Sequence, residues 1–145
     1  MRGKTFATGV LLALSVQGNT AEEQFNLKYN MLMLNAQMGE AREYMIRNNR
    51  EEALKVFKSL KTEVHDLLSN KKKIESLLPP EKKNKSDIAL ESAKMIIDNI
   101  ELIEDAYGEN KRELSPLKRQ IKAQRAYTSI ELACFHCHNL VRDQL

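Results

Sequence analysis

Five residues near the C-terminus carry the most distinctive chemistry of the chain, Cys134-Phe135-His136-Cys137-His138. They have the form C-x-x-C-H, the pattern by which haem is attached covalently to a polypeptide. Two thiols three positions apart can each add to one of the two vinyl groups of a haem, and the next imidazole can bind the iron. The segment therefore predicts two covalent anchors, Cys134 and Cys137, and a proximal iron ligand, His138.

Other kinds of site also use cysteines at this spacing. A structural zinc site needs four ligands, and the sequence has no second Cys/His cluster beside Cys134, His136, Cys137 and His138. A redox dithiol normally opens a helix after a strand in a βαβ unit, and the sequence shows no such unit. A chance occurrence on a helix is the last alternative, although the only two cysteines of the chain both lie inside the pattern.

Length and composition favour a single helical domain. The chain has 145 residues, only five glycines and three prolines, and abundant Leu, Lys, Glu, Ala and Met. Its formal charge is +3, and removal of the first twenty residues, which hold Arg2, Lys4 and no acidic residue, leaves +1. A nearly neutral domain gives no argument for nucleic-acid binding, so we expect no nucleic-acid partner.

The start of the chain has the features of an export signal. Two basic residues precede an apolar run of secretory length, and Ser15 and Gly18 offer two cleavage positions that satisfy the small-residue rule. The run is too short to span a membrane comfortably, although an uncleaved anchor is the alternative. We expect a signal peptide over residues 1–20, a mature domain over 21–145, and a location in the periplasm.

Helix signals divide the mature part into four helices. The first is predicted from Ala21 to about Arg47 and the second from about Arg50 to Leu68, with Asn49 as N-cap and Glu52 as its capping-box partner. The remaining signals are Ser86 as the N-cap of the third helix, Gly108 as its left-handed C-cap, and Ser115-Pro116 at the start of the fourth.

Apolar residues recur at steps of three and four along each predicted helix, which is bundle spacing. Residues 71–85, with two adjacent prolines, are predicted to be an extended crossover between two helical hairpins. The fold class is therefore all-α, an antiparallel up-down-up-down four-helix bundle with haem near one end. The predicted inner positions are Leu27, Met31, Leu34, Met38, Ala41 and Met45; Ala53, Phe57, Leu60, Val64 and Leu67; Ala89, Ala93, Ile96, Ile100, Ile103 and Tyr107; and Leu117, Ile121, Tyr127, Ile130, Cys134, Cys137, His138 and Val141.

In this topology the start of the first helix lies beside His138, which draws attention to Met31. A thioether suits haem iron opposite an imidazole, and the His/Met ligand set is typical of electron-transfer cytochromes. Met31 is therefore the candidate distal ligand, and its alternative role is that of an ordinary core methionine. Met38 lies about two turns, or roughly 10 Å, further along the helix, where it would contact the haem edge or the core.

The segment from Cys134 to Arg142 resembles the C-terminal signature of the cytochrome c-prime family, C-x-x-C-H-x-x-aromatic-Arg, with Val141 in place of the aromatic residue. Residues 30–35, Asn-Met-Leu-Met-Leu-Asn, are similar to the N-M-x-x-L-N motif of soluble periplasmic b-type cytochromes of the same bundle fold. This second resemblance implies that the axial methionine is Met31. In c-prime proteins the corresponding place holds a non-ligating side chain over an open iron site.

Together these features predict an exported cytochrome with one covalently bound haem c that transfers electrons to and from redox partner proteins and is not an enzyme. The alternative is a five-coordinate haem that binds nitric oxide or another small gas. A homodimer is compatible with either. Arg142 is expected to lie near the haem, where it would pair with a propionate or cap the helix, whereas His136 should point away from the iron and His65 should lie on the surface.

Overall fold

The computed structural model describes residues 21–108 and 114–141, and the side chains from residue 27 onward except that of Leu140. Within these ranges the elements are all helical and no strand occurs, which confirms the all-α class. Residues 1–20, predicted to be a signal peptide, and Arg142 lie outside the described residues. The elements are α1 (Ala21–Ile46), α2 (Arg50–Leu68), α3 (Lys71–Leu77), the 3-10 helix η1 (Pro80–Lys85), α4 (Ser86–Tyr107) and α5 (Pro116–Val141).

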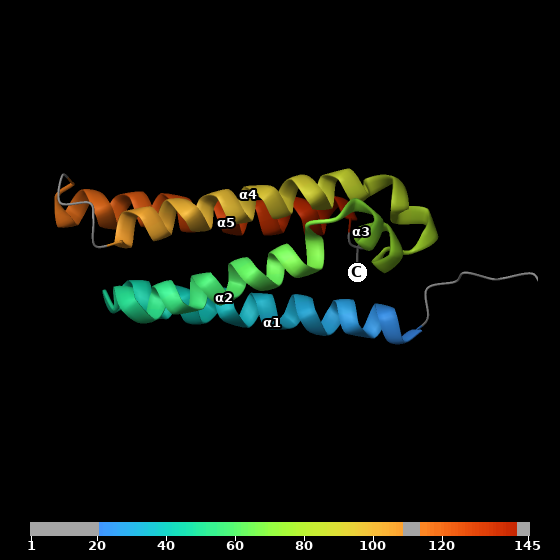
Figure 1. The fold of residues 1–145 in the computed structure, drawn as a ribbon, viewed down its shortest axis with the longest axis horizontal. Helices are drawn as coiled ribbons and strands as arrows, with labels where there is room; N and C mark the ends of the chain where they lie inside the picture. The colour runs from blue at the N-terminus through green and yellow to red at the C-terminus, as the bar shows by residue number, and fades with distance from the viewer. Residues whose placement is uncertain (1–20, 109–113, 142–145) are drawn as a thin grey trace, which may run out of the picture.

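The helices pack in chain order. α1 packs along α2, α2 along α4, and α4 along α5. Figure 1 shows α1 with α2 as one pair and α4 with α5 as the other, and it places the start of α1 and the end of α5 at the same end of the molecule. The short elements cover this end, since α3 contacts α1 and η1 contacts α5. No helix in the described ranges combines the length and hydropathy needed to cross a bilayer.

The turn between α1 and α2 reverses the chain within three residues. Asn48 adopts a positive φ of 55°, a conformation that asparagine tolerates better than most residues, and Asn49 N–H donates to Tyr44 O at 2.9 Å. The side chain of Asn49 then accepts a hydrogen bond from Glu52 N at 3.4 Å. The predicted N-cap of the second helix is therefore confirmed.

Most of residues 71–85 lie in α3 and η1, so the prediction of an extended crossover is wrong, although Leu78 and Pro79 do interrupt the helix where the prolines occur. The Asn70 side chain caps α3 by accepting from the backbone N–H groups of Lys72 and Lys73. Ile74 and Leu78, one turn apart, are 1% and 6% exposed. The adjacent prolines end α3 and begin η1, where a proline needs no N–H donor. Two apolar side chains at helical spacing thus anchor the segment that was predicted to be an extended crossover.

Both predicted caps of the third helix differ from the structure. Ser86 is buried inside the first turn of α4, where its hydroxyl is 3.3 Å from the Glu75 carboxylate, and the capping position is Lys85. Gly108 is the C-cap residue, as predicted, but its φ of −61° is not left-handed. The Arg119 guanidinium instead donates to the carbonyl oxygens of Ala106 at 2.7 Å and Gly108 at 2.6 Å. A distant cation on α5 therefore satisfies the carbonyl groups at this helix end.

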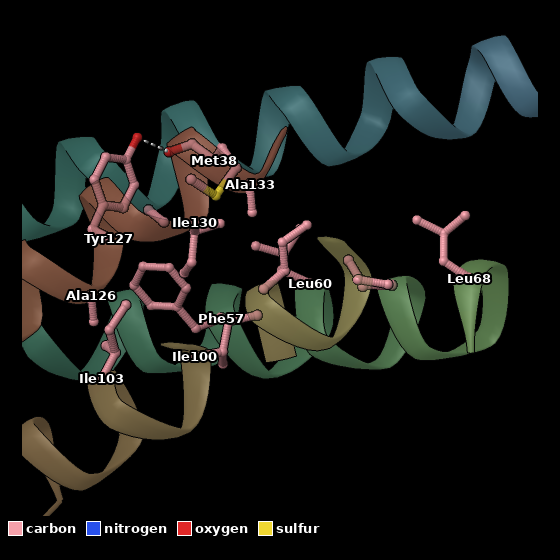
Figure 2. Close-up of a cluster of buried hydrophobic side chains, with 14 of the residues drawn as sticks. Met38, Phe57, Leu60, Leu68, Ile100, Ile103, Ala126, Tyr127, Ile130 and Ala133 are labelled. Carbon is pink, nitrogen blue, oxygen red and sulfur yellow. Dashed lines mark hydrogen bonds between the residues drawn. The ribbon is translucent and has the colours of Figure 1, made fainter. Parts of the chain in front are cut away.

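The core confirms the predicted stripes of α2 and α4 but not all of α5. Phe57 is fully buried and meets Tyr127 edge to face, with ring centroids 6.4 Å apart (Figure 2). Leu117 and Ile121, predicted to face inward, are 70% and 38% exposed. Three of the six buried positions described in α5 are alanines, whose small side chains let α5 lie close to α4. These buried alanines of α5 are Ala123, Ala126 and Ala133.

The buried apolar pair of α3 gives a test of the corrected crossover. Ile74→Ala should lower the free energy of unfolding by about 2 to 5 kcal/mol, because it opens a cavity at a fully packed position. The control is Lys72→Ala at an exposed position of the same helix, which should change stability by less than about 0.5 kcal/mol. Urea denaturation measures both, and an equally small effect at Ile74 would contradict the packing of this segment.

Candidate haem site

The site lies where two helices stay apart. All described Cα atoms of α1 and α5 are more than 8 Å from one another, although packed helices usually have axes only 8–10 Å apart. Two side chains of α5 reach across: Tyr127 O–H donates to Met38 O at 3.2 Å, drawn as a dashed line in Figure 2, and Gln120 Nε2 donates to Met45 O at 3.4 Å. Tyr127 and Gln120 both precede the C-x-x-C-H segment along α5.

A cavity of ≈ 290 Å³ lies at this separation. Its volume is close to the lower end of the range for small-molecule pockets, about 300 Å³. Side chains of α1, α2, α4 and α5 line it, and the contributions of α2 and of Ile96 on α4 are apolar. The structure thus brings together residues that are about a hundred positions apart in the sequence. The predicted site residues on its wall are Met31, Met38, Cys134, Cys137 and His138.

A larger hollow of ≈ 560 Å³ lies elsewhere, along the end of α2 and the start of α4. Its wall includes Leu68, Asp87, Leu90 and Lys94, and it contains no Cys, His or Met side chain. This hollow is the larger of the two spaces. However, only the smaller cavity is lined by thiols, an imidazole and thioethers together. The chemistry of the residues identifies the smaller cavity as the candidate site.

The methionines of α1 occupy different environments. Met31 is half-buried against the core and lines the cavity, and Met38 is 8% exposed and lines it as well. Met33 is 40% exposed and is not part of the wall. Met31 therefore lies on the face of α1 that also presents Leu34 and Asn35 to the cavity.

The histidines also differ in whether they line the cavity. His138 is exposed to solvent yet lines the cavity, so it lies at its mouth. His136 is exposed and does not line it, and His65 lies on the surface of α2 with its Nδ1 3.5 Å from Asp66. Across the described residues, no three His, Cys, Asp or Glu side chains are grouped as metal ligands.

The two thiols are free and half-buried. Burial, reinforced by the neighbouring Cys137 and Glu131, raises the pKa of the Cys134 thiol to about 11. Burial also raises the pKa of Cys137, while the Ser92 hydroxyl lowers it in part. Both groups are therefore neutral thiols at physiological pH. A thioether is neutral as well, so covalent attachment at these sulfurs would leave no charge in the buried environment.

Sequence reasoning missed several residues of the cavity wall, among them Ser92 and Gly39. Ser92 on α4 is 2% exposed, and its Oγ has no hydrogen-bond partner among the described residues. Gly39 lies in the middle of α1, where a glycine costs about 1 kcal/mol relative to alanine. Its φ is not positive, and an added Cβ would meet nothing within 4 Å. The sequence did contain a signal for each residue. Ser92 interrupts a stripe of alanines and isoleucines, and Gly39 lies inside a strong helical pattern.

Comparison with protein-family models, with curated proteins and with solved structures found no match to this chain.

The raised thiol pKa of Cys134 predicts a pH-dependent stability of the haem-free chain. The folded state holds this proton more tightly than the unfolded state, so its contribution is complete below the ordinary thiol pKa of about 8.5 and is lost as pH rises towards about 11. Urea midpoints should therefore fall over this range, and less steeply in Cys134→Ala. Parallel pH profiles of the two proteins would contradict the burial of this thiol.

Proposed function

We propose that the protein is an exported c-type cytochrome with one haem, which passes single electrons between partner proteins in the periplasm. The observation that carries this proposal is the single cavity shared by Cys134, Cys137, His138 and Met31. A C-x-x-C-H segment without a cavity would be compatible with chance. Here it lies on the wall of a largely apolar cavity, across from a thioether contributed by the opposite end of the described chain.

The proposed architecture is an antiparallel up-down-up-down four-helix bundle with the haem near one end. It is supported by the packing of α1 on α2, α2 on α4 and α4 on α5. In such a bundle α1 and α5 are the remaining neighbours, and the cavity lies between them. The proposal includes removal of residues 1–20 as a signal peptide, because extracytoplasmic maturation requires that the thiols be exported.

The chemical types of the residues that line the cavity fit a haem. The two neutral thiols stand beside the cavity, and Leu60, Val64 and Ile96 supply an apolar wall for a macrocycle. The open space at Gly39 is a second point of fit, because a helix position without a side chain lets a ligand approach the backbone closely. The unpartnered hydroxyl of Ser92 is a third.

Each side chain then has a defined task. Cys134 and Cys137 would hold the haem covalently through thioether bonds, since addition of S–H across a vinyl C=C bond needs neither an oxidant nor a reductant. His138 and Met31 would hold the iron, and this ligand pair would raise the reduction potential. When bound, haem supplies the one-electron chemistry. The apolar wall excludes water and thereby tunes the potential.

The mouth of the cavity allows electron exchange with a partner. Phe135 is 64% exposed and lines the cavity beside His138, and Leu132, one turn earlier, is 61% exposed. Apolar side chains at this edge suit the small, transient interfaces of electron-transfer partners. A homodimer remains compatible with this arrangement.

A gas-binding haem protein is the second candidate. It is favoured by the apolar side chains of Leu34 and Met38, which line the cavity on the same helix as Met31 and would surround an open iron position. Polarity and access on that side of a haem decide between gas binding and electron transfer. In this case Met31 packs against the haem and does not bind the iron.

Covalent attachment predicts a red protein. When the full chain is exported from a host that matures c-type cytochromes, its haem should remain with the polypeptide after acid-acetone extraction. Cys134→Ala together with Cys137→Ala should abolish this retention, because no thioether can form. Extractable haem in the unmodified protein, or a colourless protein, would reject the proposed attachment.

Coordination by Met31 predicts a low-spin oxidised protein. Met31→Ala should convert the visible and near-infrared spectra to a high-spin form and lower the reduction potential, because a neutral soft ligand is lost. Met33→Ala is the matched control on the exposed face of the same helix and should change neither property. A five-coordinate spectrum of the unmodified protein would overturn methionine ligation and support gas binding.

A further inference from the structure

One side chain belongs to the walls of both the candidate haem cavity and the outer hollow. Leu68, the last residue of α2, lines the cavity of ≈ 290 Å³ and also the hollow of ≈ 560 Å³. Among the described residues that line these spaces, it is the only one that they share. Leu68 is 7% exposed, so its side chain is packed in the interior and does not project into water.

The end of α2 explains why the hollow begins at Leu68. Leu60, Val64 and Leu68 follow one another at intervals of four residues, and all three line the cavity. Figure 2 shows the side chains of Leu60 and Leu68 on the same side of α2. Ser69 is exposed, and its N–H donates to His65 O at 3.0 Å in the last turn. No further turn of α2 follows to cover Leu68, and the hollow lies on that side.

α4 borders both spaces with neighbouring rows of side chains. Ser92 and Ile96 line the cavity, whereas Ala93 and Ile97, each one position later, line the hollow. Consecutive side chains of a helix point in directions about 100° apart, so the two rows are adjacent on the surface of α4. The cavity and the hollow therefore approach each other beside this helix, and Leu68 stands where they meet.

The lining of the hollow changes from charged at its rim to apolar at its floor. Asp87 and Lys94 are exposed, whereas Leu68 and Ala93 are buried and Ile97 is half-buried. An ion that passed from the rim to the cavity would lose its hydration on this apolar floor. A diatomic molecule without charge does not meet this cost, and the movement of one leucine side chain suits its small size.

The hollow and the mouth of the cavity are built from different helices. Phe135 and His138 of α5 lie at the mouth, whereas the hollow is lined by the end of α2, by Ser69 and by α4. None of the residues proposed to bind haem lines the hollow. A molecule that enters through the hollow therefore does not need to pass the proposed attachment residues.

We propose that the hollow is an entrance to the candidate haem cavity for small uncharged molecules, and that the side chain of Leu68 closes the passage between the two spaces. The passage opens when Leu68 changes rotamer, while the backbones of α2 and α4 stay in place. The passage itself does not depend on the proposed function. Its use by a diatomic haem ligand, such as carbon monoxide or nitric oxide, rests on the proposed haem.

The test of the passage uses xenon and the haem-free full chain, because xenon enters apolar cavities. The methyl groups of Ile96 report on the cavity and those of Ile97 on the hollow. Methyl relaxation dispersion under xenon pressure measures how fast xenon exchanges at each position. Leu68→Ala should accelerate exchange at Ile96 by roughly tenfold, because displacing a leucine from its preferred rotamer is a barrier of that order. Leu68→Phe should slow this exchange by a similar factor.

The matched control is Leu67→Ala in the same turn of α2. Leu67 is 8% exposed, nearly as buried as Leu68, but it lines neither the cavity nor the hollow. Its replacement should destabilise the protein comparably and leave xenon exchange at Ile96 unchanged. Unchanged exchange in both Leu68 variants would overturn the passage, as would an equal acceleration in Leu67→Ala.

The same variants separate the passage from the proposed function. In the reduced haem-loaded protein, carbon monoxide is released by a light flash and its return to the iron is followed by absorbance. Return from solvent should be faster in Leu68→Ala and slower in Leu68→Phe. Equal rates in these proteins, or a chain that acquires no haem, would reject delivery of a ligand to iron. The xenon measurements would still decide whether Leu68 closes the passage.

Discussion

The central constraint on this molecule is the unequal spacing of its long helices. α5 is held closely along α4, where buried alanines permit a short distance, and α1 is held along α2. Tyr127 and Gln120 bridge from α5 to two carbonyl groups of α1. Beyond these bridges the two helices are not packed together, and the cavity lies there. A protein interior normally closes such a space, and the proposed haem would fill it.

Much of the fold was predictable because it depends on local rules. The starts of α2 and α5 follow from Asn49 and Ser115, whose side chains accept hydrogen bonds from backbone N–H groups of the first turns. The stripes of α2 and α4 follow from helical periodicity. The errors have tertiary causes. Ile74 and Leu78 fold the crossover because they find a core to enter, and Arg119 satisfies the end of α4 from another helix. Leu117 and Ile121 have the correct period, but no helix among the described residues buries them.

For the candidate site, sequence reasoning identified residue types but not their surroundings. The C-x-x-C-H pattern named the thiols and the imidazole, and the order of the helices led to Met31; the structure places all of them around one cavity. Ser92 and Gly39 were missed because a single serine or glycine in a helix has many explanations. Their meaning depends on an unpartnered hydroxyl and on open space beside the backbone, which only three-dimensional packing reveals.

Both thiols are neutral and half-buried at the edge of an apolar cavity, an environment that suits a thioether better than a thiolate or a metal-bound sulfur. The most direct test of this account is the intact mass, under denaturing conditions, of the protein exported from a host that matures c-type cytochromes. The account predicts the mass of the chain without its signal peptide plus one haem, with both cysteines resistant to alkylation. The mass of the unmodified chain, with two thiols free to react, would contradict it.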